Sequence, residues 1–548
     1  MTTQTYDTVI IGGRYFDGTG AASSVQNIGI KNGSIARVTT DTLSLEGNPR
    51  IIDAAGKWVT PGFLDTHTHY DAEVLVTPSL SESVRHGVTT VLVGSCSLSM
   101  ICSDAEDASD IFTRVETVPR EKVLPILKAK KTWSKPSEWV EYINKQPLGP
   151  NMISFIGHSD MRVAAMGIMD ATDRKVKPSK EQMETQLEDA LESGFLGLST
   201  MRLHWDKIDG DRAWSRSLPS TYAQVSELWR LNRMVRRYNR IHQGAPNAAN
   251  PLRILEYLID TIGIFRRPLK TTLIALFDLR GNRTLRPLSQ LASRFVNSIG
   301  GAFRWQVLPT PFTVYADGID VVFFEEFGAG ELALDLKTQV ERNDLFRDES
   351  YRRNFRKFYG EKLSPRVWQR DFGDAIVLKC PDQSLEGKNF DEIARARSIH
   401  VVDLFLDLVM EFGRDLRWYT TVANDDKKVL RNMVKDDNIL VTFSDAGAHI
   451  RNMAFYNLPL RFLKLVKEAA DENSSMMSME KAIWRMTGEQ ADWLGIDAGK
   501  IREGDRADLV VINPNCFDQN LEQVCWAEME NFDLQRLVNR NPGLVEHV

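Results

Sequence analysis

The stretch "GFLDTHTHY", residues 62–70, places His67 and His69 two residues apart at the end of an apolar run. Side chains alternate between the two faces of a β-strand, so both imidazoles project from the same face. Two neutral imidazoles on one face make half of a tetrahedral metal site. A pair of surface histidines at a strand end explains an isolated His-x-His equally well, so the rest of the chain decides.

Length and composition set the first limits. The 548 residues suffice for one large α/β domain with additions, or for two or three domains. The net charge of −6 is spread thinly, without a basic block, which gives nucleic-acid binding little support. No apolar run approaches the roughly 18 residues of a membrane span, and the first residues lack the features of a secretory signal. With five cysteines, too sparse and odd a set for a disulfide framework, the chain is predicted to be a cytoplasmic enzyme.

The middle of the chain alternates strand-like and helix-like segments. The strand candidates are 62–69, 88–94, 152–158, 195–200, 238–242, 271–276, 302–308 and 439–445. Eight such repeats are typical of an α/β fold of the (β/α)8, TIM-like barrel type, predicted here over residues 61–488. In such barrels the reactive groups lie at the carboxyl ends of the strands.

Three further regions surround this predicted barrel. Residues 1–60 and 489–514 both contain short strand-like runs joined by glycine turns. This pattern predicts a small β-sandwich built from both chain ends. Residues 311–395 form a polar and aromatic insertion after the seventh strand, and an excursion at that end of a barrel usually covers or shapes the pocket. The apolar content of this insertion is compatible with a homodimer. Residues 515–548 are a C-terminal extension.

Metal-binding residue types recur where strand candidates end. Beyond His67 and His69, they are Cys96, His242 and Asp445, after the second, fifth and eighth strands. Each alone has an ordinary explanation: a buried thiol, a hydrogen-bonded histidine or a turn-forming aspartate. Together, five side chains of ligand type on four strands converge on one end of one barrel, which packing alone does not explain.

Several motifs carry a family resemblance. The segments "TPGFLDTHTHYD", "SDAGAH" and "GKIREGDRADLVVINP" resemble the amidohydrolase superfamily, and "GVTTVLVGSCSLS", with its cysteine after the second strand, is similar to the N-acyl-D-amino-acid deacylase (D-aminoacylase) branch. The resemblance covers nearly the whole chain except the insertion and the tail. It implies a zinc ion, for which thiolate and imidazole are suitable ligands. The ligands it implies are His67, His69, Cys96, His242 and Asp445, and Asp445 is also the implied catalytic base.

The chain departs from this branch in two places. The branch carries a further histidine at the end of the sixth strand, where this chain has Leu276 and Phe277, with Asp278 as the nearest substitute. One tight zinc site is therefore expected, with a weakened second site. The branch also has a glycine and a tyrosine after the fourth strand, where Met201 and His204 stand here, so the substrate end of the pocket is expected to differ.

The predicted reaction is hydrolysis of a C–N amide bond in a small N-acylated amino acid or related amide. A metal-activated water attacks the carbonyl, with Asp445 as general base. The free carboxylate of such a substrate needs a cation, and arginine can pair with it through two hydrogen bonds. The candidate substrate-binding residues are Arg202, His204, Arg280, His449 and Arg451.

Two other functions stay open at this stage. A cyclic amidase of the hydantoinase or dihydroorotase kind usually has a carboxylated lysine on the fourth strand, and "FLGLST" contains no lysine. A degenerate barrel that binds a ligand without turnover would explain the missing sixth-strand histidine. Retention of Asp445 with the other four ligand positions argues against pure binding, because a binding protein needs no base.

Overall fold

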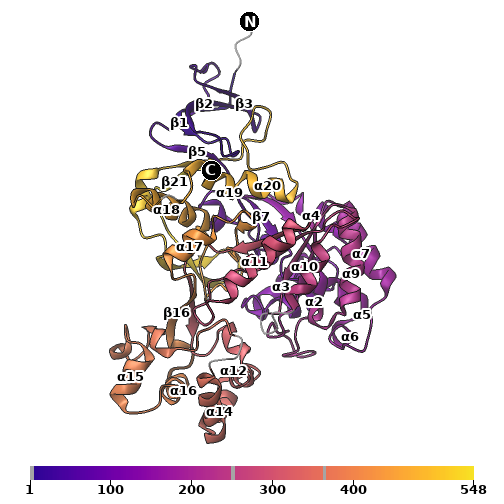
Figure 1. Ribbon diagram of the computed structural model, residues 1–548, viewed down its shortest axis with the longest axis vertical. Helices are drawn as coiled ribbons and strands as arrows, with labels where there is room; N and C mark the ends of the chain where they lie inside the picture. Colours follow the sequence, from indigo (N-terminus) through magenta and orange to yellow (C-terminus); the bar gives the residue numbers. More distant parts are fainter. Residues whose placement is uncertain (1–4, 248–252, 362–365, 475) are drawn as a thin grey trace.

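The computed structural model describes residues 5–247, 253–361, 366–474 and 476–548. Parallel strands form the centre of the described chain, and each predicted strand segment of the middle region overlaps one of them (Figure 1). In chain order they are β6 (Phe63–Asp65), β7 (Val88–Val93), β8 (Asn151–Ser154) and its continuation β9 (Ile156–Gly157), β10 (Gly197–Met201), β11 (Ile241–Ala245), β12 (Lys270–Leu273), β13 (Ala302–Val307) and β17 (Ile439–Val441).

The pairing of these strands follows the chain. β6, β7 and β8 form one parallel sheet, and β9 to β13 followed by β17 form another. The step from β8 to β9 joins the two sheets, and a parallel bridge between Thr68 and Ala446 links the end of β6 to the segment after β17. The carboxyl ends of the first and last strands therefore lie side by side.

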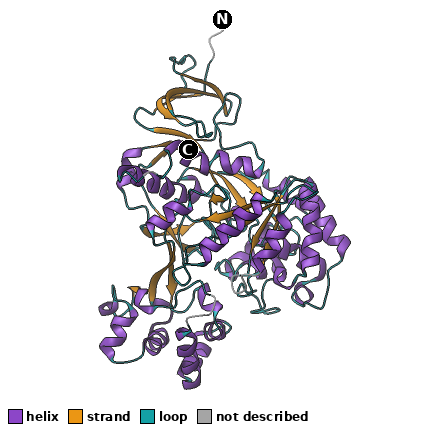
Figure 2. Cartoon of the chain, in the orientation of Figure 1, coloured by secondary structure: helices purple, strands orange, loops and turns teal. Residues whose placement is uncertain are grey.

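Helices lie between these strands along the chain (Figure 2). α9 illustrates why they form: Leu228, Leu231 and Val235 recur at helical spacing and are buried, so one face packs inward. None of the described helices combines the length and apolar character that a membrane crossing requires. The helices outside the insertion are α1 (Ser81–Val84), α2 (Ala105–Phe112), α3 (Arg120–Lys130), α4 (Pro136–Ile143), α5 (His158–Met166), α6 (Ile168–Ala171), α7 (Lys180–Glu192), α8 (Pro219–Tyr222), α9 (Val225–Arg237), α10 (Ile254–Thr261), α11 (Leu285–Ser298), α17 (Lys427–Met433), α18 (Leu458–Asp471), α19 (Met479–Met486) and α20 (Gly488–Leu494).

Both chain ends meet in one seven-stranded sheet at the top of Figure 1. Its strands are β1 (Thr8–Tyr15), β2 (Ser24–Lys31), β3 (Ser34–Thr39), β4 (Arg50–Asp53), β5 (Trp58–Pro61), β18 (Leu509–Ile512) and β21 (Val545–His547). Ala491 and Leu494 of α20 instead pack with apolar residues of the central strands, so the predicted segment 489–514 joins this sheet only from Ile501 onward. The C-terminal extension contributes β21 and a hairpin of β19 (Val524–Met529) and β20 (Leu534–Asn539).

The insertion forms a lobe of its own, at the bottom of Figure 1. It contains a three-stranded sheet of β14 (Phe312–Asp317), β15 (Ile376–Lys379) and β16 (Arg417–Ala423). Most of its aromatic side chains form a separate core, including Phe324, Trp368 and Trp418. The predicted end at residue 395 falls inside α15, and the lobe continues to β16 because β16 pairs with β14. Its helices are α12 (Gly328–Leu334), α13 (Gln339–Arg347), α14 (Glu349–Gly360), α15 (Phe390–Arg397) and α16 (Val401–Phe412).

Candidate metal centre

Four side chains of ligand type converge beyond the carboxyl ends of β6, β7 and β17. The ligand atoms of His67, His69 and Cys96 all lie within 4.8 Å of one another. The Cys96 Sγ is 3.3 Å from His67 Nε2, and Asp445 Oδ1 is 3.4 Å from His67 Nε2 and 3.6 Å from His69 Nε2. All four side chains are buried. We call these four residues the ligand cluster.

The orientation of His67 is fixed by a glutamine on β13. His67 Nδ1 lies 2.7 Å from Gln306 Oε1, and an amide oxygen can only accept a hydrogen bond. The proton is therefore on Nδ1, and Nε2 presents its lone pair to the cluster, as a metal-binding imidazole must. Burial lowers the pKa of His67 to about 4, which keeps the ring neutral at neutral pH.

Left-handed backbone conformations gather at the cluster. Cys96 has φ of 56°, Phe443 of 101°, Asp445 of 52° and His449 of 46°, and none of these residues is glycine. Such conformations cost on the order of 1–3 kcal/mol each and persist only where the surrounding structure holds them. Because they occur together where the ligand side chains are aimed, we attribute this strain to the site.

A carboxylate outside the cluster lies beside the imidazole of His69. Glu116 Oε1 lies 3.3 Å from His69 Nδ1, and Glu116 Oε2 lies 3.9 Å from His449 Nε2. Burial raises the pKa of the Glu116 carboxyl to about 8. Burial alone would lower the pKa of His69, but Glu116 and Asp445 beside it raise that pKa well above its ordinary value. No sequence motif marks Glu116, which stands in the loop after α2.

A cavity of about 250 Å³ opens from the cluster toward the insertion. Its polar lining residues near the cluster include Glu116, Asp206 and His449. The insertion contributes Phe312, Val322 and Val367. The remaining lining is mainly apolar, with residues such as Met201, Leu203, Trp205, Ile274, Leu276, Phe277, Leu279, Trp305 and Phe443.

Known proteins resemble this chain along most of its length, although no family model matches it. An uncharacterized protein of Mycobacterium tuberculosis (strain ATCC 25618 / H37Rv) is 46% identical, covering 99% of this chain and 90% of that protein. The N-acyl-D-glutamate deacylase of Alcaligenes xylosoxydans xylosoxydans is 32% identical over 35% of this chain and 37% of its own length. The solved N-acyl-D-glutamate deacylase of Bordetella bronchiseptica, complexed with zinc and a phosphonate inhibitor, superposes with a TM-score of 0.60 at 20% identity, covering 99% of this chain and 96% of that one.

The characterised homologues and the structural neighbours of the chain are thus N-acyl-D-amino-acid deacylases of the amidohydrolase superfamily. These relatives and structural neighbours are metal-dependent amidohydrolases. The superposition also agrees with the fold described above, since both chains are matched almost from end to end.

His242 does not join the ligand cluster. Its Nε2 lies 2.9 Å from Thr200 Oγ1, its Nδ1 lies 3.1 Å from Asn232 Nδ2, and its ring stacks on Tyr257. The register explains this: β10 and β11 pair with Leu198 opposite His242, so His242 shares the outward face with Thr200. The next residue, Gln243, faces inward and accepts a hydrogen bond of 3.0 Å from the Cys96 amide.

Most of the predicted substrate-binding residues lie away from the cavity. Arg202 donates to the backbone carbonyls of Ser220 and Ala223, His204 is exposed, and Arg451 pairs with Asp317. His449 is the one of the five that lines the cavity in the described structure.

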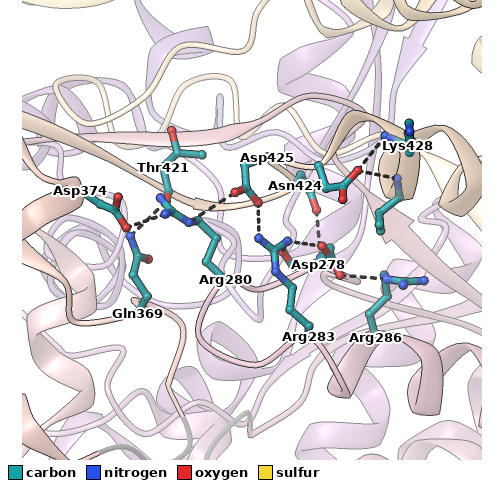
Figure 3. A network of polar contacts seen from close by, with 12 residues as sticks. Asp278, Arg280, Arg283, Arg286, Gln369, Asp374, Thr421, Asn424, Asp425 and Lys428 are labelled. Atoms are coloured by element: carbon teal, nitrogen blue, oxygen red, sulfur yellow. Dashed lines mark hydrogen bonds and ion pairs between the residues drawn. The ribbon is translucent and has the colours of Figure 1, made fainter.

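Arg280 holds the insertion against the central strands (Figure 3). Its guanidinium lies 2.5 Å from Asp374 of the insertion and 3.4 Å from Asp425. In the same network, Asp278 pairs with Arg283 and Arg286, so it does not stand in for the missing sixth-strand histidine. The polar residues after β12 therefore anchor the insertion.

The loop that carries Cys96 is held by a buried aspartate of α5. Asp160 Oδ2 accepts hydrogen bonds from the Ser99 hydroxyl at 2.7 Å and from the amides of residues 101 and 102 at 2.9 and 2.8 Å. Its Oδ1 accepts from the Ser103 amide at 2.8 Å. One carboxylate thus holds residues 99–103, the part of the loop that follows Cys96.

Replacing Asp160 by alanine is expected to lower the free energy of unfolding by at least about 3 kcal/mol, because several buried donors lose their partner. Urea denaturation followed by circular dichroism measures this. The matched control is Asp170→Ala at an exposed position of α6, which should unfold like the unmodified protein. Equal midpoints for the two variants would show that Asp160 does not hold the loop.

Proposed function

We propose that the chain is a zinc-dependent hydrolase of a C–N amide bond in a small N-acylated amino acid or related amide. The observation that carries this proposal is the ligand cluster: two imidazoles, a thiol and a carboxylate, all buried and facing one point. We propose further that the eight parallel strands close into a (β/α)8 barrel. The bridge between Thr68 and Ala446 supports closure, since it joins the first strand to the last.

The residues present fit a zinc ion. His67, His69, Cys96 and Asp445 would hold it, a donor set of nitrogen, sulfur and oxygen that zinc accepts. Burial raises the pKa of the Cys96 thiol to about 12, and an adjacent cation favours the thiolate. A zinc ion bound there would supply a water of pKa near about 7 as nucleophile and would polarise the amide carbonyl.

Asp445 moves the proton in the proposed reaction. Burial alone would raise its pKa, but the His69 and His67 imidazoles beside it lower the pKa below its ordinary value, so the carboxylate is ionised. It takes a proton from the attacking water as the new C–O bond forms. It then gives that proton to the nitrogen as the C–N bond breaks, which leaves a carboxylic acid and an amine. Glu116 lies beside His69, and His449 lies beside Glu116, so both are close to this path.

The insertion shapes the substrate end of the site in this proposal. Phe312, Val322 and Val367 reach the cavity, and the Arg280 network fixes the lobe that carries them. An apolar cover of this kind keeps bulk water from the reacting groups.

The test is amine release from N-acyl-D- and N-acyl-L-amino acids and from the corresponding amino-acid amides by the purified protein, combined with metal analysis. We expect about one zinc ion per chain, because the sixth strand offers Leu276 and Phe277 and His242 faces outward. We expect release only from zinc-containing protein, restored by zinc after chelation. Full activity in protein free of transition metal would refute the proposal.

A further inference from the structure

An aromatic wall runs from the ligand cluster to the insertion. The ring of Phe443 lies 4.8 Å from that of His67, and Phe277 lies 5.9 Å from Phe443. Phe277 in turn stacks on Phe312 of the insertion at 4.8 Å. We call Phe443, Phe277 and Phe312 the aromatic wall. All three residues line the cavity, together with its other apolar lining residues.

The charged groups of the cavity are unevenly placed. Next to the reacting groups stand acids, Glu116 and Asp206 in addition to Asp445. Among the described residues that line the cavity, Arg286 is the only arginine or lysine. Its Nε already lies 3.0 Å from Asp278 Oδ1, and its Nη1 lies 2.8 Å from Gln290 Oε1. A substrate carboxylate would therefore find no free arginine or lysine among the described side chains that line the cavity, because Arg286 is already paired.

The size of the cavity limits the group that it can bury. An apolar cavity of about 150 Å³ holds a benzene molecule. By that measure the volume of about 250 Å³ holds a group on the order of ten carbon atoms.

We propose that the substrate amide carries a medium-length apolar acyl chain, of about eight to ten carbons, which lies along the aromatic wall, and an amine half without a free carboxylate. This inference rests on the proposed amide hydrolysis and names its substrate class. The acyl carbonyl is then attacked at the ligand cluster, and the amine leaves toward Glu116 and Asp206.

The test is a series of para-nitroanilides with acetyl, butanoyl, octanoyl and tetradecanoyl groups. We expect kcat/KM to rise by up to about fourfold for each added methylene, and at least about 100-fold from acetyl to octanoyl, then to level off or fall at tetradecanoyl. N-octanoylglycinamide is expected to be hydrolysed at least about tenfold faster than N-octanoylglycine. Equal rates along the series, or a preference for the free carboxylate, would overturn the inference.

A binding measurement separates this inference from the proposed reaction. Octan-1-ol cannot be hydrolysed, and calorimetry should show it binding at least about tenfold more tightly than butan-1-ol. Phe277→Ser should abolish that difference, whereas Phe277→Leu, which keeps an apolar side chain, should retain it. If these results hold but no amide is cleaved, the reaction fails and the apolar subsite stands. If amides are cleaved but octan-1-ol binds no better than butan-1-ol, the subsite fails alone.

A separate observation concerns the surface of α11, whose exposed side is apolar. Leu288, Leu291 and Phe295 are 63%, 65% and 62% exposed, at positions that share one helix face. The residues that α11 buries are mostly polar: Ser289, Gln290, Ser293 and Val296. This polarity is the reverse of what a solvent-facing helix shows, so the outer face needs a partner.

Neighbouring elements extend this face. Leu255 and Ile259 of α10 are exposed, and so are Ile264 and Phe265 of the next loop. A backbone hydrogen bond from Gly263 to Gly300 holds that loop beside the end of α11, and α10 packs on α11 (Figure 1). At about 200 Å² for a large apolar side chain, the exposed fractions amount to roughly 1,000 Å². The exposed apolar residues of α11, α10 and the loop after α10 together form what we call the apolar patch: Leu288, Leu291, Phe295, Ile299, Leu255, Ile259, Ile264 and Phe265.

We infer that a second copy of this chain covers the apolar patch in a symmetric dimer. The roughly 1,000 Å² exceeds the largest apolar patch of a typical monomer and is comparable to the share of one partner, about 800 Å², in a stable interface. Two copies related by a twofold axis would bury both apolar faces against each other. The interface lies on α10 and α11, not on the insertion.

Sedimentation velocity of the full chain tests this. We expect a dimer across roughly a fiftyfold range of concentration, and a monomer for Leu291→Asp combined with Phe295→Asp. The matched control is Val340→Asp, at an exposed position of α13, which should stay dimeric. A monomeric unmodified chain, or a dimer that survives the double substitution, would overturn the inference. Flotation of a monomeric unmodified chain with phosphatidylglycerol vesicles would assign the patch to a lipid surface instead.

Discussion

Asp445→Asn is expected to lower kcat by about three orders of magnitude or more on any amide that the protein hydrolyses. An asparagine side chain cannot take a proton from the attacking water, and general base catalysis alone contributes about 10²–10⁴-fold. The substitution also removes the negative oxygen that lies 3.4 and 3.6 Å from the two imidazoles. Steady-state kinetics on zinc-loaded protein measure the effect, and kcat should fall more than KM changes.

The fold should survive this substitution, because the Asp445 backbone keeps its hydrogen bond to His67 and only one side chain changes. Thermal denaturation is the control, and Asp170→Asn on the surface of α6 serves as the matched aspartate variant. Near-normal turnover in Asp445→Asn would mean that another group, such as Glu116, is the base.

Two histidine substitutions are expected to differ sharply in zinc binding. His67→Ala removes a ligand whose Nε2 faces the cluster and should weaken zinc binding by at least about 100-fold. His242→Ala removes a ring that hydrogen-bonds to Thr200 and Asn232, so the affinity for zinc should stay within about threefold of normal while stability falls. Competition with a chromogenic chelator measures both affinities.

The comparison of these two variants decides whether His242 is a zinc ligand. The family resemblance includes His242 among the ligands, whereas the structure turns it outward. Equal loss of zinc in both variants would restore His242 to the ligand set and contradict the geometry described here.

The sequence was sufficient for much of the fold and for part of the site. The strand segments of the middle region were predicted because apolar strands bounded by glycine and polar residues stand out against amphipathic helices such as α9. His67, His69, Cys96 and Asp445 were predicted to lie together, and the structure brings them together because parallel strands end at the same edge.

Other features depend on information that one sequence lacks. In "RIHQGA" either residue of the pair His242 and Gln243 can face inward, and pairing with β10 decides which one does. Glu116 lies in a loop without a motif, so only the folded chain shows its position beside His69. The sequence predicts that the insertion ends at residue 395, which is too early, because β16 is recognisable only through its pairing with β14.

X-ray absorption spectroscopy at the zinc edge of the zinc-loaded protein tests the central claim most directly. We predict one zinc per chain with a single sulfur ligand at about 2.3 Å and nitrogen or oxygen ligands at about 2.0–2.1 Å. The sulfur shell should disappear in Cys96→Ala and persist in Cys102→Ala, a matched cysteine on the same loop. A spectrum without sulfur in the unmodified protein, or a sulfur shell that survives Cys96→Ala, would contradict zinc binding by the ligand cluster.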